Sequence, residues 1–401
     1  MKIALIGNMN NNFFSLLRYF RDLGMDVTLF LYKNEQAHFL PEYDTREINK
    51  WKKYIIKTNL INGFKKRDFS LLHTSKSEIK KIFESYNVII GSGISPVYIN
   101  RAGLKLDLFV PYGMNVEFTD IHSSSISKII SSNVLKYLQE KAISTSVSYS
   151  VSFDKITIKK LNKYGPKVLY MGLPMLYNKE NLKYIPKHLK EIIKKFAKHD
   201  LIVFSHISHI WKNIPTTWRN SYSRNDLLIS AFSSYLKKST LKKPLLVLFE
   251  YGPDVLHTKQ LIKKYNIQDN ILWLNIMPRK DIMILLKYVD IGVGKLGDNY
   301  MWGGVGWEFL ASGVPFFYNL QFSNEEYLKL TSIPMPNIFK NASELDIINH
   351  LLNFEKSPNN YKKIGKELQI WFNKYGGVGL ASIWKDIVTK IYIEKQTHAS
   401  S

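Results

Sequence analysis

Residues 298–315 read Asp298-Asn299-Tyr300-Met301-Trp302-Gly303-Gly304-Val305-Gly306-Trp307-Glu308-Phe309-Leu310-Ala311-Ser312-Gly313-Val314-Pro315. A short apolar strand is predicted just before this stretch, and a helix is predicted over 305–312 after its glycine-rich turn. Helix N-termini carry unpaired N–H groups and the positive end of the helix dipole, so they favour phosphate. Glycine also lets a backbone approach an anion closely. The stretch therefore indicates a nucleotide-binding strand–turn–helix unit, with tight helix–sheet packing as the purely structural alternative.

Strands and helices alternate on both sides of this stretch. Buried strands are predicted at 3–6, 26–30, 88–91, 106–110 and 168–172, and again at 201–204, 245–249, 271–274, 291–293 and 315–318. This alternation is typical of parallel sheets and predicts an α/β protein with two Rossmann-like, doubly wound domains facing a cleft. We expect an N-terminal domain over 1–174 and a second domain over 175–378 that opens with a lysine-rich linker. The helix at 379–401 is expected to pack back on the first domain.

Composition restricts the chemistry of the chain. Its 401 residues are 45% hydrophobic and include no cysteine, which excludes disulfides, Cys-ligated metals and a Cys nucleophile. The net charge is +23, with +11 in residues 1–174 and +12 in the remainder. No apolar run approaches the ~20 residues of a membrane span. We expect a cytoplasmic protein whose partners carry phosphates, such as a nucleotide or an anionic membrane surface, and no nucleic acid partner.

The order of residues in the second half resembles a known family. The segment Gly303–Pro315 resembles the donor-binding segment of family 4 glycosyltransferases of the GT-B fold, of the type that builds bacterial surface glycans. Further similar segments occur in the order of that family, at 204–212, 225–232, 249–254, 277–279 and 289–290. The resemblance covers residues 200–320 well and the first domain only in outline.

This resemblance implies a retaining hexosyltransferase-like enzyme that uses a nucleotide-diphosphate sugar, without a cofactor or an essential metal. The acceptor would be a glycan, such as a polysaccharide or lipopolysaccharide, or a lipid-linked sugar. By the same resemblance, Glu308 would bind the ribose. The turn at Gly303, Gly304 and Val305 would face the pyrophosphate, and Met277 and Arg279 would line the base.

The chain departs from the family pattern in two respects. Tyr300 stands where the first glutamate of the family's E-x7-E motif is expected, and the nearest carboxylate is the candidate catalytic residue Asp298. Retention and inversion therefore both stay open. The family's usual Arg and Lys align with Ser208 and Ser223. A diphosphate needs positive charge rather than one fixed position, so Lys212, Arg219 or Arg224 are candidate replacements.

Two features of the first domain are candidate site elements. Gly7, Asn11 and Asn12 follow the first strand, where ligands bind open α/β sheets, and are candidates for a phosphate or acceptor loop. A polar turn that only caps the next helix is the alternative. His122 is a candidate catalytic residue near the transferred sugar, although a lone histidine is often structural.

A basic and aromatic stretch at 51–67 indicates contact with anionic lipid headgroups. We expect its cations to attract a membrane surface and its aromatic residues to insert shallowly, which would make the protein peripheral on the inner face of the plasma membrane. The residues predicted to make this contact are Trp51, Lys52, Lys53, Lys65, Lys66 and Arg67.

Two alternatives to a glycosyltransferase remain. One is a non-hydrolysing nucleotide-sugar 2-epimerase of the same fold. The other, from a different class, is a basic non-catalytic protein that binds a nucleotide sugar or a membrane. The sequence identifies neither the sugar, the base, the acceptor nor the oligomeric state.

Overall fold

A computed structural model describes residues 1–62, 72–111, 126–146, 148–151, 159, 161–164, 167–170, 172–180, 182–212, 222–299, 301–340 and 342–400. The chain forms two compact units, which are described separately. Unit 1 comprises Met1–Tyr177 together with Gly376–Ser401, and unit 2 comprises Asn178–Tyr375.

Unit 1 is built on a parallel sheet, which has seven strands within the described residues in the order β3-β2-β1-β4-β5-β6-β7. The strands are β1 (Lys2–Ile6), β2 (Asp26–Leu31), β3 (Ile55–Lys57), β4 (Val88–Ser92), β5 (Leu108–Val110), β6 (Ser148–Val151) and β7 (Lys167–Tyr170). Its helices are α1 (Asn12–Asp22), α2 (Pro41–Asp44), α3 (Ile48–Trp51), α4 (Lys76–Phe83), α5 (Ser95–Arg101), α6 (Ile126–Ser144) and α16 (Val378–Ser400).

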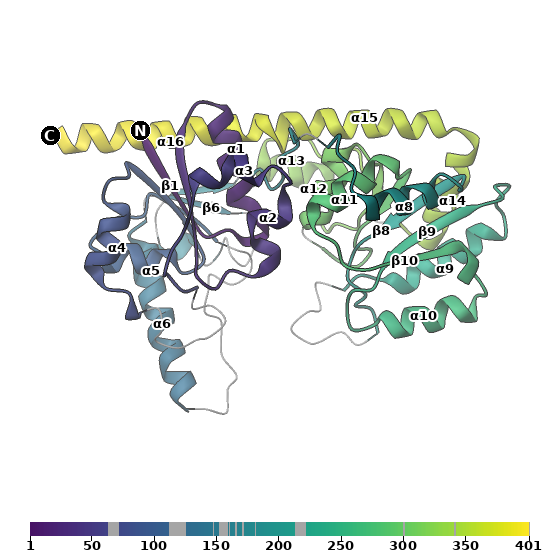
Figure 1. The fold of residues 1–401 in the computed structure, drawn as a ribbon, viewed down its shortest axis with the longest axis horizontal. Helices are drawn as coiled ribbons and strands as arrows, with labels where there is room; N and C mark the ends of the chain where they lie inside the picture. The colour runs from purple at the N-terminus through teal and green to yellow at the C-terminus, as the bar shows by residue number, and fades with distance from the viewer. Residues whose placement is uncertain are drawn as a thin grey trace. The chain divides into compact units, whose positions relative to one another are not determined.

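Both faces of this sheet are covered, which explains the continuous apolar runs of its central strands. Ile3 and Leu5 of β1 pack in a core with α1 and α16, while Ala4 and Ile6 pack in a second core with α4, α5 and α6. Figure 1 shows α1 and α16 adjacent to each other. The alternation of side chains along one strand thus supplies both layers of the unit.

The last helix, α16, is an integral part of unit 1. Trp384 is fully buried in the core, and its indole N–H donates to the carbonyl of Gly172 at 2.9 Å. Further along the helix, the Lys395 ammonium lies 2.9 Å from the buried Asp107 carboxylate. The helix therefore packs residues 378–400 against residues from the first 177 positions of the sequence.

Unit 2 has a smaller parallel sheet, which within the described residues has five strands in the order β10-β9-β8-β11-β12. They are β8 (Leu201–Ser205), β9 (Pro244–Phe249), β10 (Ile271–Leu274), β11 (Ile291–Val293) and β12 (Phe316–Phe317). The helices are α8 (Lys187–Phe196), α9 (Asn225–Leu236), α10 (Val255–Lys264), α11 (Arg279–Leu285), α12 (Gly303–Ser312), α13 (Asn324–Thr331), α14 (Glu344–Lys356) and α15 (Pro358–Tyr375).

Helices α9, α10 and α14 share one core with the strands of unit 2. On the opposite face, a side chain at Gly292 of β11 would collide with Phe309 of α12, so α12 lies directly against the sheet there. The chain order turns back between β8 and β11, which makes their carboxyl ends the topological switch point of this sheet.

The structure corrects parts of the sequence prediction. The lysine-rich segment at the start of the second domain contains α8, as its helical spacing of apolar residues indicates, and Leu189 and Phe196 are buried in unit 2, so this part is not a free linker. Trp51, expected to insert into a membrane, is only 2% exposed and packs in the core of unit 1, so its indole is not available to lipid. Lys52 and Lys53 are exposed, whereas Lys65, Lys66 and Arg67 lie outside the described residues.

Candidate functional site

The glycine-rich turn starts α12, two residues earlier than the sequence predicts. Gly303 has φ of +58°, a left-handed conformation that favours glycine. A side chain at Gly304 would lie 3.5 Å from a terminal guanidinium nitrogen of Arg279. The positive end of α12 and the Arg279 guanidinium are therefore neighbours, which is a suitable arrangement for an anion.

Glu308 lies one turn further along α12 and is the centre of a buried charge cluster. Its Oε1 accepts a hydrogen bond from Arg279 Nε at 2.8 Å, and its Oε2 lies 2.6 Å from His206 Nε2. Burial by itself would raise the pKa of Glu308, but the hydrogen bonds and charges of His206 and Arg279 outweigh it and the pKa is lowered. Glu308 is therefore an ionised carboxylate at neutral pH, oriented by two partners that sequence reasoning did not connect to it.

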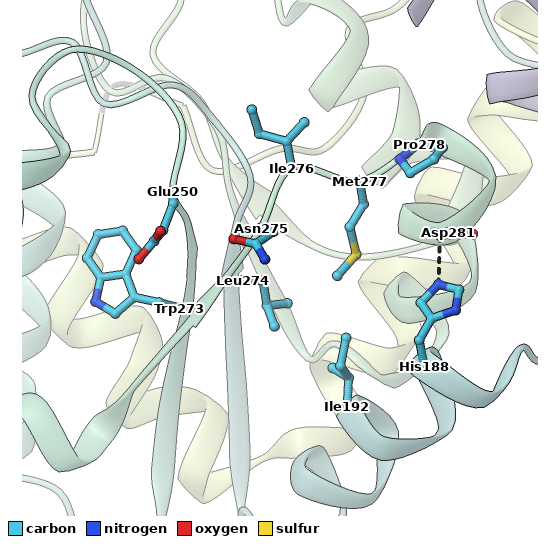
Figure 2. A pocket seen from close by; sticks show the side chains of 10 residues that line it. All are labelled: His188, Ile192, Glu250, Trp273, Leu274, Asn275, Ile276, Met277, Pro278 and Asp281. Carbon is cyan, nitrogen blue, oxygen red and sulfur yellow. Dashed lines mark hydrogen bonds and ion pairs between the residues drawn. The ribbon is translucent and has the colours of Figure 1, made fainter.

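A cavity of about 460 Å³ lies at the carboxyl end of β10, and its lining includes Met277 and Pro278, which directly precede Arg279 in the chain. Figure 2 shows Met277 and Asn275 above it, with Ile192 of α8 below. On its right side, His188 Nε2 lies 2.9 Å from Asp281 Oδ2, which links α8 to α11. The predicted base-lining residue Met277 thus contributes to the lining, and Arg279 begins α11 next to it.

The loop after β8 is fixed by the loop after β9. The backbone N–H groups of Trp211 and Lys212 both donate to one carboxylate oxygen of Asp254 at 2.8 Å. Gly252 lies so close that a side chain there would come within 2.5 Å of the backbone nitrogen of His209. The His209 ring is buried and its Nδ1 lies 2.9 Å from Thr258 Oγ1. This anchoring holds the edge of the site in place.

The predicted diphosphate cations have other partners in this structure. The exposed Lys212 ammonium lies 3.3 Å from His257 Nδ1, and Arg224 Nε donates to both carboxylate oxygens of Asp226 at 3.1 Å. Arg219 lies outside the described residues. The candidate catalytic residue Asp298 is exposed and accepts a long hydrogen bond from Tyr222 at 3.4 Å.

A set of buried polar side chains lies next to the switch point, and sequence reasoning considered only one of them, Ser223, as a position where the family's usual cation is missing. Ser223 and Asn225 are 0% and 1% exposed, and among the described residues Ser223 Oγ and both side-chain polar atoms of Asn225 have no hydrogen-bond partner. Half-buried Lys295 follows β11, and its pKa is lowered by burial. In the sequence, nothing distinguishes this lysine from the many surface lysines.

The corresponding edge of unit 1 contains the predicted polar loop. Gly7 has φ of +88°, and the buried Asn11 side chain is bonded internally to Asn8 and to the carbonyl of His38. Asn8 Oδ1 accepts from the Phe14 N–H and so satisfies one of the unpaired donors in the first turn of α1, whose N-cap residue is Asn11. Asn12 lies in the first turn of α1, and its Oδ1 is buried without a partner among the described residues. The other predicted catalytic residue, His122, falls outside the described residues.

A carboxyl group that the sequence did not reveal borders this loop. Glu35 Oε1 accepts the Asn8 N–H at 3.1 Å. Burial raises the pKa of Glu35 to about 7, against the lowering effect of backbone hydrogen bonds from Asn8 and Tyr32. Glu35 can therefore hold or release a proton near neutral pH at the carboxyl edge of this sheet.

Neither metal clusters nor membrane spans emerge from the part of the chain that the structure describes. No group of three or more His, Asp or Glu side chains there is placed to hold a metal ion. No helix in the same part is long and apolar enough to cross a bilayer.

Comparisons with known proteins show which solved structures share this fold. No protein-family model matches the chain, and no curated protein matches it by sequence. Among solved structures, HepE from Anabaena in complex with UDP is similar with a TM-score of 0.60 at 13% identity, over 97% of this chain and 100% of HepE. Sucrose-phosphate synthase from Thermosynechococcus elongatus is similar with a TM-score of 0.59 at 14% identity, over 100% of both chains.

The same architecture also occurs outside glycosyl transfer. A UDP-N-acetylglucosamine 2-epimerase candidate from Listeria monocytogenes is similar with a TM-score of 0.51 at 12% identity, over 95% of this chain and 94% of that protein. At these identities the likeness establishes the fold alone. The chain therefore has the two-domain α/β fold of GT-B glycosyltransferases.

Proposed function

We propose that the protein is a glycosyltransferase that moves a sugar from a nucleotide-diphosphate sugar to a glycan or a lipid-linked acceptor. The observation that carries this proposal is the cluster of Glu308, Arg279 and His206, in which Arg279 lies next to the start of α12 and directly follows the cavity residues Met277 and Pro278. Three parts of a nucleotide sugar match three neighbouring features of unit 2. The base would enter the cavity at Met277, the ribose would meet Glu308, and the diphosphate would lie at the start of α12.

Glu308 is suited to bind a ribose although both of its oxygens already have partners. Each carboxylate oxygen can accept more than one hydrogen bond, so a ribose diol can add to the bonds from Arg279 and His206. Because burial and two partners fix the carboxylate, little side-chain entropy is lost when the sugar binds. Arg279 lies next to both Glu308 and Gly304, and so couples the ribose subsite to the diphosphate subsite.

The chemistry we infer needs the nucleoside diphosphate to leave with its charge stabilised. Preoriented N–H groups and cationic side chains supply such stabilisation in a site that excludes water. We propose retention at the anomeric carbon and no requirement for a cofactor or metal. Nuclear magnetic resonance of the first-formed product would test retention, and turnover in the presence of a chelator would test metal independence.

The acceptor would bind to unit 1, where the loop at Gly7 and Asn12 lies at the carboxyl edge of the sheet and Glu35 provides a group that titrates near neutrality. The exposed Lys52 and Lys53 are the described part of the proposed membrane contact. Sedimentation with anionic and with neutral vesicles would test that contact independently of turnover.

The central test is the substitution Glu308→Gln, which preserves the shape of the side chain and removes its charge. We expect the affinity for the nucleotide sugar to fall roughly 10- to 100-fold, because charge-assisted hydrogen bonds to the ribose are lost. Calorimetry against UDP-, GDP-, ADP- and CMP-sugars measures this change. The matched control is Glu191→Gln, which alters an exposed residue of α8 and should bind like the wild type. Unchanged donor affinity in a folded Glu308→Gln variant would contradict the assignment.

A nucleotide-sugar 2-epimerase is the second candidate function, because this chain shares its fold with the Listeria protein. An epimerase would convert the donor without any acceptor, whereas a glycosyltransferase would release nucleoside diphosphate in proportion to the acceptor glycosylated. Donor binding without either reaction would indicate the third possibility, a non-catalytic nucleotide-sugar protein.

A further inference from the structure

Lys295 occupies the position in unit 2 where an open α/β sheet binds its ligands. It lies two residues beyond the end of β11, which is adjacent to β8. The hydroxyl of Ser205, the last residue of β8, donates to the carbonyl of Val293 at 2.9 Å and holds the two strand ends together. These strands flank the switch point, and crevices for ligands form at the carboxyl ends of such strands.

The ammonium group of Lys295 has an unusual environment for a lysine. The side chain is half-buried, burial lowers its pKa, and among the described residues no carboxylate or hydrogen-bond acceptor is bonded to it. Taking an ammonium out of water without a partner is unfavourable, and buried charges are normally paired, so a ligand of opposite charge would supply the partner that Lys295 lacks.

The backbone next to Lys295 is bonded to the entry of α9. The N–H of Leu296 donates to the carbonyl of Ser223 at 3.1 Å. The following residue, Arg224, is the N-cap of α9, and its side chain makes no capping hydrogen bond to the first turn. The N-terminus of α9 therefore lies beside Lys295 with no side-chain cap from its N-cap residue, and its positive dipole end favours an anion.

Two deeply buried side chains at this helix end lack partners. Ser223 Oγ and the whole amide group of Asn225 have no hydrogen bond within the ranges that the structure describes, although both residues are at least 99% buried. Buried polar groups are nearly always satisfied, so this combination points to a ligand that the protein binds here. A phosphate oxygen would accept from the hydroxyl, from the amide NH₂ and from the ammonium together.

We propose that Lys295, Ser223 and Asn225 form a phosphate-binding site at the N-terminus of α9. Its ligand class is a phosphate or diphosphate group. Identifying that group as the diphosphate of a nucleotide sugar rests on the proposed function, and the diphosphate would then contact the start of α12 and the N-terminus of α9 together. The site also explains why Ser223 can be small and uncharged, since Lys295 in the neighbouring segment after β11 provides the cation.

Inorganic pyrophosphate, UDP and uridine are the probes for this site, with binding measured by calorimetry and thermal unfolding. In Lys295→Met we expect pyrophosphate and UDP to bind roughly 10- to 100-fold more weakly, because a desolvated charge-assisted contact is lost, while uridine affinity stays unchanged. The free variant should melt at a higher temperature than the free wild type, because an unpaired and partly desolvated charge is removed. Lys263→Met, at an exposed position of α10, is the matched control and should bind both anions normally.

Wild-type affinity for pyrophosphate in Lys295→Met, or a lower melting temperature of the free variant, would overturn the proposal and indicate a structural lysine. Pyrophosphate binding that depends on Lys295 in a protein that turns over no donor would uphold the site and reject the proposed function. Normal donor turnover in Lys295→Met would uphold the proposed function and reject the phosphate site.

A charge-relocation pair provides the second test. Lys295→Ser alone should weaken pyrophosphate binding, and the double variant S223K/K295S should recover at least part of it. The recovery is expected because the hydrogen bond between Leu296 N–H and the Ser223 carbonyl joins the two segments, so a lysine at position 223 returns an ammonium group to the same site. A folded double variant that binds as weakly as Lys295→Ser would show that the two positions do not share a ligand, and would overturn the proposed site.

Discussion

At the scale of single residues, two histidines three positions apart have opposite surroundings. His206 lies against the Glu308 carboxylate, whereas His209 is turned into the packing between two loops and touches Thr258. Burial lowers the pKa of His209 to about 4, against the raising effects of a backbone hydrogen bond and of Asp254. His209 is therefore neutral in the folded protein over the range in which it would become charged in the unfolded chain.

This difference predicts a loss of stability in mild acid. The folded pKa of His209 lies below the unfolded value of 6.5, so the stability it provides is complete above pH 6.5 and is lost as the pH falls towards 4. Between pH 7.5 and pH 4.5 we expect the free energy of unfolding to fall by about 2.5 kcal/mol more in the wild type than in His209→Gln. Urea unfolding at both pH values measures this, and the other titrating groups cancel in the comparison. Parallel losses in both proteins would show that His209 is not responsible.

The same pair shows how far the sequence could predict the site. The sequence could indicate the residues of one segment, such as Gly303, Gly304 and Glu308, as candidates because a glycine-rich turn before a helix has a local physical meaning. The partners His206 and Glu308 are 102 positions apart, and only the parallel sheet brings the ends of β8 and β11 together. Lys295 was missed for the same reason, because burial depends on the neighbouring segments and not on the residue itself.

At the scale of elements, Gly252 connects the loops after β8 and β9. Its φ of +109° and the 2.5 Å approach of the His209 backbone leave no space for a side chain. For Gly252→Ala we expect a loss of about 2–5 kcal/mol from backbone strain and steric overlap together. The control is Gly24→Ala, which has a positive φ but nothing within 4 Å, and should lose only about 1–2 kcal/mol. Equal losses in chemical denaturation would mean that the close contact between the loops is unimportant.

Element prediction succeeded where apolar periodicity was strong and failed where it was weak. The central strands of both sheets are continuous apolar runs because helices cover both faces, so their sequences predicted them. Strand β6 has the sequence Ser-Tyr-Ser-Val and β3 has only three residues, Ile-Ile-Lys, so neither contains an apolar run long enough to predict a strand. Trp51 was misread because its lysine neighbours are exposed while the indole itself is turned into the core.

At the scale of the whole molecule, unit 1 depends on the last helix of the chain. For Trp384→Ala we expect the free energy of unfolding of unit 1 to fall by about 3–5 kcal/mol, because a fully buried indole and its bond to Gly172 are lost. Hydrogen exchange should increase in β1 and α1 and stay unchanged in β8 of unit 2. Ile393→Ala, at a position 56% exposed on the same helix, serves as control. Equal exchange in the two variants would mean that α16 contributes little to unit 1.

Unit 1 is formed by two separate segments of the chain, which affects the order in which the two units fold during synthesis. Unit 2 is one continuous run from Asn178 to Tyr375, whereas unit 1 needs both the first 177 residues and the segment that begins at Gly376. Domains usually fold in the order in which the ribosome produces them, from the N-terminus onward. Here the order is expected to reverse, because unit 2 can complete its core while unit 1 still lacks Trp384. During that interval the first unit would expose the apolar face of β1 and α1, and this is when nascent chains would need chaperones most.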